Sequence, residues 1–162
     1  MTRDELLSRM AVAYYEYLNA IVPVIKKDPL IAKGIKEGLN KFLTNCCIAL
    51  VGKTETDYYS PAALEIIKNK KKLAGLVYEH MIPKNIYQDK IVKNFIEGKI
   101  KSAEDIKTVL DQYWYIALIT KHEDKLLFPQ RSMLETWDSK NILARYSMVK
   151  VIPRKECRQE EF

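Results

Sequence analysis

The stretch Tyr113-Trp114-Tyr115-Ile116-Ala117-Leu118-Ile119-Thr120 decides the fold class, because it carries the strongest strand signal in the chain. It is rich in aromatic and β-branched residues and contains neither Gly nor Pro, which is the composition that strands favour. A second short apolar run, from Leu73 to Tyr78, follows a break in helical spacing and also predicts a strand. Longer stretches with helical spacing surround both runs. The sequence therefore predicts an α+β fold that is mainly helical.

Helical spacing dominates the residues that precede the first predicted strand. Thr2-Arg3-Asp4-Glu5 is a capping box, and apolar residues follow it at mostly helical intervals. We expect Pro23 to kink or end this first helix and Gly52 to stop a second one. The polar residues 53–59 predict a loop. Ser60-Pro61 then supplies an N-cap and a first-turn proline for a third helix that ends in a run of lysines.

The region between the two predicted strands returns to helical spacing and reads as a helical insertion over residues 86–112. A short helix over residues 121–127 is expected directly after the second strand. Asp138 is expected to cap a last helix that runs to about Tyr146.

The length of 162 residues fits one domain with a real core. Residues 1–72 form a helical N-terminal part, and residues 73–152 form a mixed α/β part that contains the candidate site. Residues 153–162 are a charged tail that we expect to be mobile. No Gly/Ser linker separates the parts, so the sequence predicts a single packed domain over residues 1–162.

Charge and cysteine usage narrow the functional classes. The net charge is +6, and a basic surplus attracts polyanions by releasing their counterions, although a solvated basic surface is the alternative. Cys46, Cys47 and Cys157 form no CxxC pair, which favours free thiols in a reducing compartment. Asp4 and Glu5 stand where a signal peptide would be basic, and no apolar run is long enough for a membrane span. We therefore expect a cytoplasmic protein without membrane contact.

The chain has two histidines, His80 and His122, and each falls at the end of a predicted strand. A strand end is a rigid place from which a side chain can reach a cleft. Glu79 sets a carboxylate beside the His80 imidazole. Successive strand residues face opposite sides, so both can address one ligand only if the strand ends there. Pro83, shortly beyond, is consistent with such an end.

The segment Val77-Tyr78-Glu79-His80-Met81-Ile82-Pro83-Lys84 resembles the opening of the HNH, or ββα-metal (His-Me finger), nucleases. Their first strand usually reads apolar-Asp-His-apolar-apolar-Pro. In that family the His is the general base that activates water, and the acid before it often binds the single divalent metal. The resemblance implies that His80 is the catalytic base and Glu79 a metal ligand. It also implies a small two-stranded ββα-like element, interrupted by the helical insertion, on which the helical N-terminal part packs.

The second half of the family motif is a strand followed by a short helix that gives an Asn or His to the metal. Ala117–Thr120 and Lys121–Lys125 take these places here, and His122, Glu123 or Asp124 would have to substitute for the Asn or His. The resemblance implies Mg²⁺ or Mn²⁺ held by carboxylate oxygens, the ligands that hard cations prefer. The expected metal ligands are Glu79, Glu123 and Asp124, and the expected phosphate-binding residues are Lys84, Lys121 and Lys125.

The resemblance predicts a metal-dependent endonuclease that hydrolyses nucleic-acid phosphodiester bonds, with DNA favoured over RNA, of the restriction, phage or defence kind. The alternative is a non-catalytic phage or host regulator or inhibitor that binds nucleic acid or a protein partner on a nuclease-like scaffold. In that case His80 would only close a strand end, and Glu123 and Asp124 would be first-turn acids that suit the helix dipole. A homodimer through the tyrosine-rich first helix is a further expectation.

Overall fold

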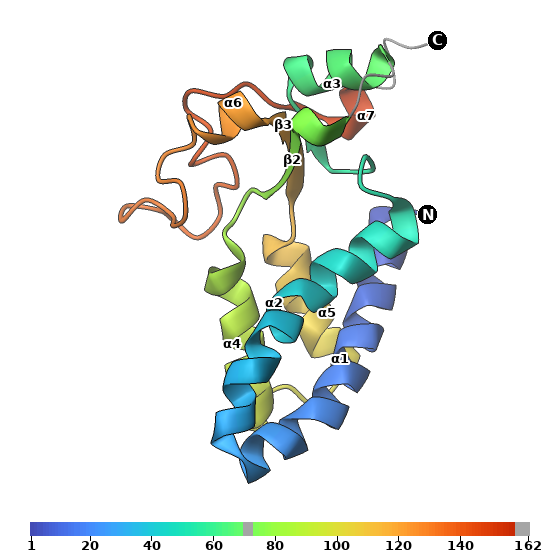
Figure 1. Cartoon of the computed structure of the whole chain (residues 1–162), viewed down its shortest axis with the longest axis vertical. Coiled ribbons are helices and arrows are strands. Elements are labelled where there is room, and N and C mark those ends of the chain that lie inside the picture. The colour runs from blue at the N-terminus through green and yellow to red at the C-terminus, as the bar shows by residue number, and fades with distance from the viewer. Residues whose placement is uncertain (70–72, 158–162) are drawn as a thin grey trace. The chain divides into compact units, whose positions relative to one another are not determined.

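The structure is a computed structural model that describes residues 1–69 and 73–157. It is mainly helical with one small four-stranded sheet, which confirms the predicted α+β class. The chain divides into two compact units (Figure 1). The first comprises Met1–Gly52 and Lys84–Tyr113, and the second comprises Lys53–Pro83 and the chain from Trp114 onward. The single domain expected from the sequence stays a prediction, and Lys70, Lys71 and Lys72 of the lysine run lie outside the described residues.

The first unit is a bundle of four helices: α1 (Arg3–Lys27), α2 (Pro29–Val51), α4 (Lys84–Ile96) and α5 (Ala103–Tyr113). α1 packs against both α2 and α5, and α4 packs against α5 (Figure 1). The predicted capping box begins α1. The Glu5 amide donates to the Thr2 hydroxyl at 3.2 Å, and the Glu5 carboxylate accepts from the Thr2 amide at 2.7 Å. At the C-terminal end of α2, Gly52 ends the helix with a φ of 89°, a conformation that favours glycine.

The helix α1 continues through Pro23 to Lys27, so Pro23 does not end it, and the alternative expectation of a kink there stays a prediction. Proline removes only one backbone hydrogen bond, and Pro23 is exposed, so its ring meets no tightly packed neighbour. The chain turns instead at Asp28. Its carboxylate accepts from the Leu30 amide at 2.9 Å and so caps α2.

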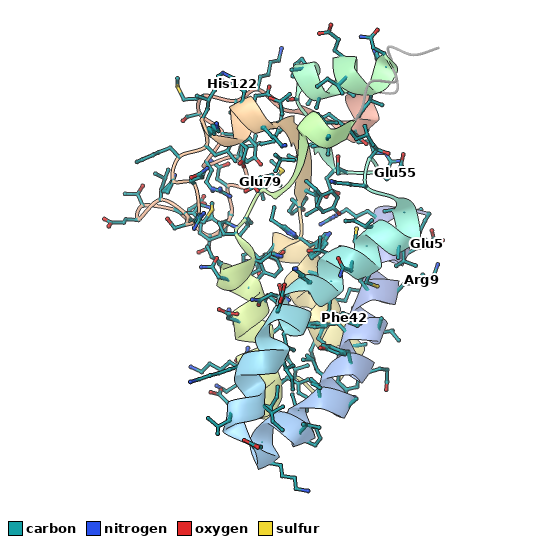
Figure 2. The ribbon with its side chains drawn as sticks, viewed as in Figure 1. Glu5, Arg9, Phe42, Glu55, Glu79 and His122 are labelled. Atoms are coloured by element: carbon teal, nitrogen blue, oxygen red, sulfur yellow. The ribbon has the colours of Figure 1, made fainter. Side chains whose placement is uncertain are left out.

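Aromatic rings pack inside the first unit, between α1 and its neighbours. The Phe42 ring of α2 stacks on Tyr17 at 4.4 Å and on Tyr14 at 5.5 Å between ring centroids, and Figure 2 shows Phe42 on α2. Tyr15 meets Phe95 edge-on at 5.6 Å, and its hydroxyl donates to the Lys101 carbonyl at 2.8 Å. The tyrosines of the first helix therefore serve packing within this unit, and a homodimer through that helix stays a prediction.

The second unit is built on the sheet, whose strand order is β2-β3-β1-β4. Its strands are β1 (Tyr58–Tyr59), β2 (Leu76–His80), β3 (Ile116–Thr120) and β4 (Ile152–Pro153). Its helical elements are α3 (Pro61–Lys68), the short 3₁₀ turn η1 (Leu73–Gly75), α6 (Lys121–Asp124) and α7 (Arg154–Cys157). β3 pairs antiparallel with β2 and parallel with β1, and β4 pairs antiparallel with β1.

The sheet has four strands in place of the two expected, and two stretches differ from the sequence prediction. Tyr58 and Tyr59, expected in a loop, pair with Ala117 and Leu118, because the buried strand β3 offers its backbone on both edges. The chain over 152–157 forms β4 and α7, where the sequence indicated no regular structure, and the mobility expected of the tail stays a prediction.

The helix expected from Asp138 to Tyr146 is also absent, which corrects another expectation. The Asp138 carboxylate accepts from the amides of Lys140 at 2.9 Å and Asn141 at 2.8 Å, and these bonds are the largest causes that lower its pKa. Ser139, which directly follows Asp138, has a φ of 62°, which a right-handed helix does not allow. The Asp138 side chain therefore stabilises a turn and does not cap a helix.

The two faces of the sheet bury different partners. One face carries Val77, Met81, Ala117 and Ile119, and residues from the segment after α6 cover it. The other face carries Leu76 and Leu118, which the helix α3 covers. Because β3 is buried on both faces, it reads in the sequence as a continuous apolar run.

None of the helices within residues 1–69 and 73–157 combines the length and the apolar character that a membrane crossing requires.

The neighbours Tyr14 and Tyr15 offer a matched test of the packing of α1. The Tyr14 hydroxyl is buried beside the Gln88 side chain without a hydrogen bond of good geometry, and burial is the main cause that raises its pKa to about 12. We expect Tyr14→Phe to leave the free energy of unfolding unchanged or to raise it by up to about 1 kcal/mol, whereas Tyr15→Phe should lower it by about 1 kcal/mol because it removes a hydrogen bond. Urea unfolding followed by far-UV circular dichroism measures both, and a larger loss for Tyr14→Phe would contradict the packing described.

Candidate functional site

Glu79 and His80 end the strand β2, and they lie on opposite faces of the sheet. In the register of β2 with β3, Glu79 pairs with Ala117 and His80 pairs with Ile116. Glu79 shares a face with Val77, whereas the His80 ring is only 7% exposed and meets the Trp114 ring edge-on at 4.9 Å. The motif therefore sends its carboxylate and its imidazole to two separate environments.

The guanidinium of Arg145 occupies the environment of Glu79. Arg145 is 1% exposed, and its Nη1 donates to Glu79 Oε1 at 3.0 Å and to the His80 carbonyl at 3.1 Å. Its Nε donates to the Pro129 carbonyl at 2.7 Å, and its Nη2 donates to the Gln130 carbonyl. A buried guanidinium needs a carboxylate and carbonyls of this kind to offset its lost hydration. Glu79 is thus already paired with a cation supplied by the chain itself.

The Glu123 carboxylate serves the start of α6. Its Oε2 accepts from the Thr120 amide at 2.8 Å, from the Thr120 hydroxyl at 2.9 Å and from the Ser60 hydroxyl at 2.6 Å. The Ser60 oxygen also accepts from the Ala63 amide at 3.1 Å, which caps α3. Glu123 therefore completes one helix cap and links it to another, and one of its two oxygens is fully used by these bonds.

Asp124 and Glu79 both act electrostatically on Tyr146. The Tyr146 ring is buried, and its hydroxyl has no partner among the described residues. Burial is the main cause that raises the pKa of this phenol, the negative charges of Glu79 and Asp124 raise it further, and the positive charge of Arg145 lowers it. Two of the predicted metal ligands, Glu79 and Asp124, thus act electrostatically on the same buried phenol.

The structure does not bring His80 to the acids of α6. Leu76, at the far end of β2, pairs with Thr120, so His80 stands four residues along the strand from the start of α6, about 13 Å away. His122, Lys121 and Lys125 are exposed on α6 or at its end, as Figure 2 shows for His122.

The last predicted phosphate contact, Lys84, begins α4 in the first unit. Its Nζ donates to the Asn40 carbonyl at 3.0 Å.

The predicted catalytic base His80 and the predicted metal ligands Glu79 and Glu123 have different partners in the structure. Glu79 faces Arg145, Glu123 faces Thr120 and Ser60, and His80 lies on the other face of the sheet. Within residues 1–69 and 73–157, no group of three or more His, Cys, Asp or Glu side chains is placed to hold one metal ion. The divalent metal and the ligand set that the resemblance implies therefore stay predictions.

Two residues at this site, Arg145 and Ser60, make contacts with Glu79 and Glu123 that the sequence did not predict. Arg145 stands in the apolar run Ile142-Leu143-Ala144-Arg145-Tyr146, and an arginine among apolar residues signals a buried cation that needs an acid. Ser60 was identified only as an N-cap, and nothing in the sequence links it to Glu123, which lies 63 positions away.

Comparison of the chain with models of protein families, with curated proteins and with solved structures finds no match.

The ion pair can be tested because both tryptophans of the chain, Trp114 and Trp137, belong to the second unit and report its unfolding by fluorescence. We expect Arg145→Leu to lower the free energy of unfolding by about 3 kcal/mol or more, because it leaves Glu79 facing apolar residues with no cation. The double variant that adds Glu79→Leu should recover a large part of this loss, since no unpaired charge then remains.

Arg131→Leu is the control, because Arg131 is exposed on the same segment and its loss should change the free energy by less than about 0.5 kcal/mol. Equal losses for Arg131→Leu and Arg145→Leu, or a double variant as unstable as the sum of the single ones, would contradict the pairing.

Proposed function

We propose that this chain is a non-catalytic regulator or inhibitor that binds a protein partner on a nuclease-like scaffold. The observation that carries the proposal is the buried Arg145, which takes the Glu79 carboxylate and the His80 carbonyl for itself. The motif that would begin a nuclease site holds a neighbouring segment in place here. We call that segment, residues 125–151, the presented segment.

The presented segment is long, irregular and firmly held. It runs from the end of α6 to the start of β4 without a helix or strand, well beyond the roughly 12–15 residues at which structureless loops become uncommon and usually functional. Leu127, Tyr146 and Val149 are buried against the sheet, and Arg145 anchors its middle. Loops on a rigid scaffold are where binding residues concentrate, so this segment is the favoured contact surface.

The presented segment also exposes large apolar side chains. Phe128 is 69% exposed and Met148 is 72% exposed, and Leu126 and Leu143 are exposed as well. Phe128 lies beside the Arg145 backbone, to whose carbonyl its amide donates at 3.3 Å. Exposed aromatic and Met side chains are typical of protein–protein contacts, whereas nucleic-acid surfaces are polar and rich in paired lysine and arginine contacts. These side chains favour a protein partner over nucleic acid.

The second candidate is the metal-dependent endonuclease, which one observation favours. β2 and β3 form an antiparallel pair, and α6 follows β3 directly, so strand, strand and helix occur in the order that the resemblance implies. Against it stand the pairing of Glu79 with Arg145 and the distance of His80 from α6.

A plasmid-cleavage assay separates the two candidates. With Mg²⁺ or Mn²⁺ and supercoiled plasmid, we expect no nicking above the level of His80→Ala, because the expected base and metal ligands do not share one site. Metal-dependent nicking that disappears in His80→Ala, while that variant keeps its circular dichroism spectrum, would overturn the proposal in favour of the nuclease.

A binding assay tests the proposed surface. The double variant Phe128→Ser/Met148→Ser removes two exposed apolar side chains, and Val12→Ser in α1, which is 54% exposed, is the matched control. We expect one protein from extracts of the source cells to be retained by the wild type and by Val12→Ser, and to be retained at least tenfold less by the double variant. The purified partner should then form a complex of fixed stoichiometry with the wild type.

Two results would contradict this surface. One is equal retention of every protein by all three forms. The other is retention of nucleic acid alone, released by salt, which would indicate the polyanion-binding version of the regulator.

A further inference from the structure

The presented segment carries exposed positive charges close to its exposed apolar side chains. Lys125 and Arg131 each stand three positions from Phe128, and Lys150 stands two positions after Met148. All three cations are exposed, and none of them forms an ion pair within residues 1–69 and 73–157. Three residues of chain span at most roughly 10 Å, about one Debye length at physiological salt, so each charge acts at the edge of the apolar surface.

Backbone hydrogen bonds join the two halves of this surface. The Phe128 amide donates to the Arg145 carbonyl at 3.3 Å, and the Val149 amide donates to the Tyr146 carbonyl at 3.1 Å. The backbone at Phe128 and the backbone at Met148 are therefore separated by one hydrogen bond and three positions of chain. A single short stretch of a partner can reach both side chains.

The acidic side chains of the presented segment do not balance these charges. Within residues 125–151 the acids are Glu135 and Asp138, and both stand seven or more positions from Phe128 and from Met148. The Asp138 carboxylate is already bonded to two backbone amides of its own turn. The surface around the two exposed side chains is therefore apolar with a positive edge.

This combination fits one kind of partner better than the others. A phosphate backbone would match the cations but leave Phe128 and Met148 in water, and a purely apolar protein surface would leave the cations unmatched. A stretch of protein that carries both carboxylates and apolar side chains matches both features.

We propose that the presented segment binds an acidic, amphipathic stretch of its partner, an inference that rests on the proposed function. The apolar side chains of that stretch pack on Phe128 and Met148. Its Asp or Glu side chains lie beside Lys125, Arg131 and Lys150, where they fix the register of the contact and speed association.

Short random peptides displayed on phage and selected on the immobilised full chain test the proposal. We expect the enriched peptides to combine Asp or Glu with large apolar residues such as Leu, Phe or Trp. The best peptide is then synthesised, and its affinity for the purified variants is measured by fluorescence anisotropy.

Two triple variants with the same change in charge separate a local effect from a general one. The charge variant Lys125→Gln/Arg131→Gln/Lys150→Gln should bind the peptide about tenfold more weakly than the wild type, and added salt should weaken wild-type binding. The control Lys26→Gln/Lys27→Gln/Lys33→Gln removes three exposed lysines from α1 and α2, and it should change the affinity by less than about twofold.

The outcomes distinguish this inference from the proposed function. Enriched peptides without acids, bound equally by the wild type and the charge variant but not by Phe128→Ser/Met148→Ser, would overturn the acidic partner and leave the proposed function standing. Peptides bound equally by all forms would contradict both. The inference also fails if no peptide is enriched, or if a single-stranded oligonucleotide binds through the three cations without needing Phe128 and Met148.

Discussion

The buried contact between Arg145 and Glu79 determines much of the second unit. A guanidinium that is 1% exposed cannot stay there without compensation, and it finds one carboxylate and three backbone carbonyls. Two of those carbonyls, from Pro129 and Gln130, belong to the same presented segment as Arg145, and the other partners belong to the end of β2. The Arg145 side chain therefore bonds to two carbonyls of the presented segment and also links this segment to the end of β2.

This contact decides how the Glu79-His80 pair is used. The alternation of β2 sends Glu79 toward the presented segment and His80 toward Trp114, so the two side chains cannot share a ligand. The acids of α6 also differ in what they act on, because Glu123 completes helix caps and the charge of Asp124 raises the pKa of Tyr146. In the structure, Glu79, His80 and Glu123 therefore have three different sets of partners.

The sequence predicted the regular parts of this fold well. The capping box at Thr2, the Ser60 cap, the stop at Gly52 and the strand ending at Thr120 all depend on residues that are close in the chain, and their signals are local. The errors arose where distant backbone decides. The strand β1, for example, exists because β3 offers it a partner.

The candidate site could be predicted only in part, for the same reason. The motif located the end of β2 correctly. Its acid Glu79, however, pairs with Arg145, which lies 66 positions away, and this contact cannot be predicted without knowing the fold. Amide hydrogen exchange on Glu79→Gln tests most directly whether the ion pair holds the presented segment. We predict that the amides of Phe128, Tyr146 and Val149, which bond within that segment, lose protection while those of β3 keep it. Unchanged protection of these three amides would contradict the role given to the ion pair.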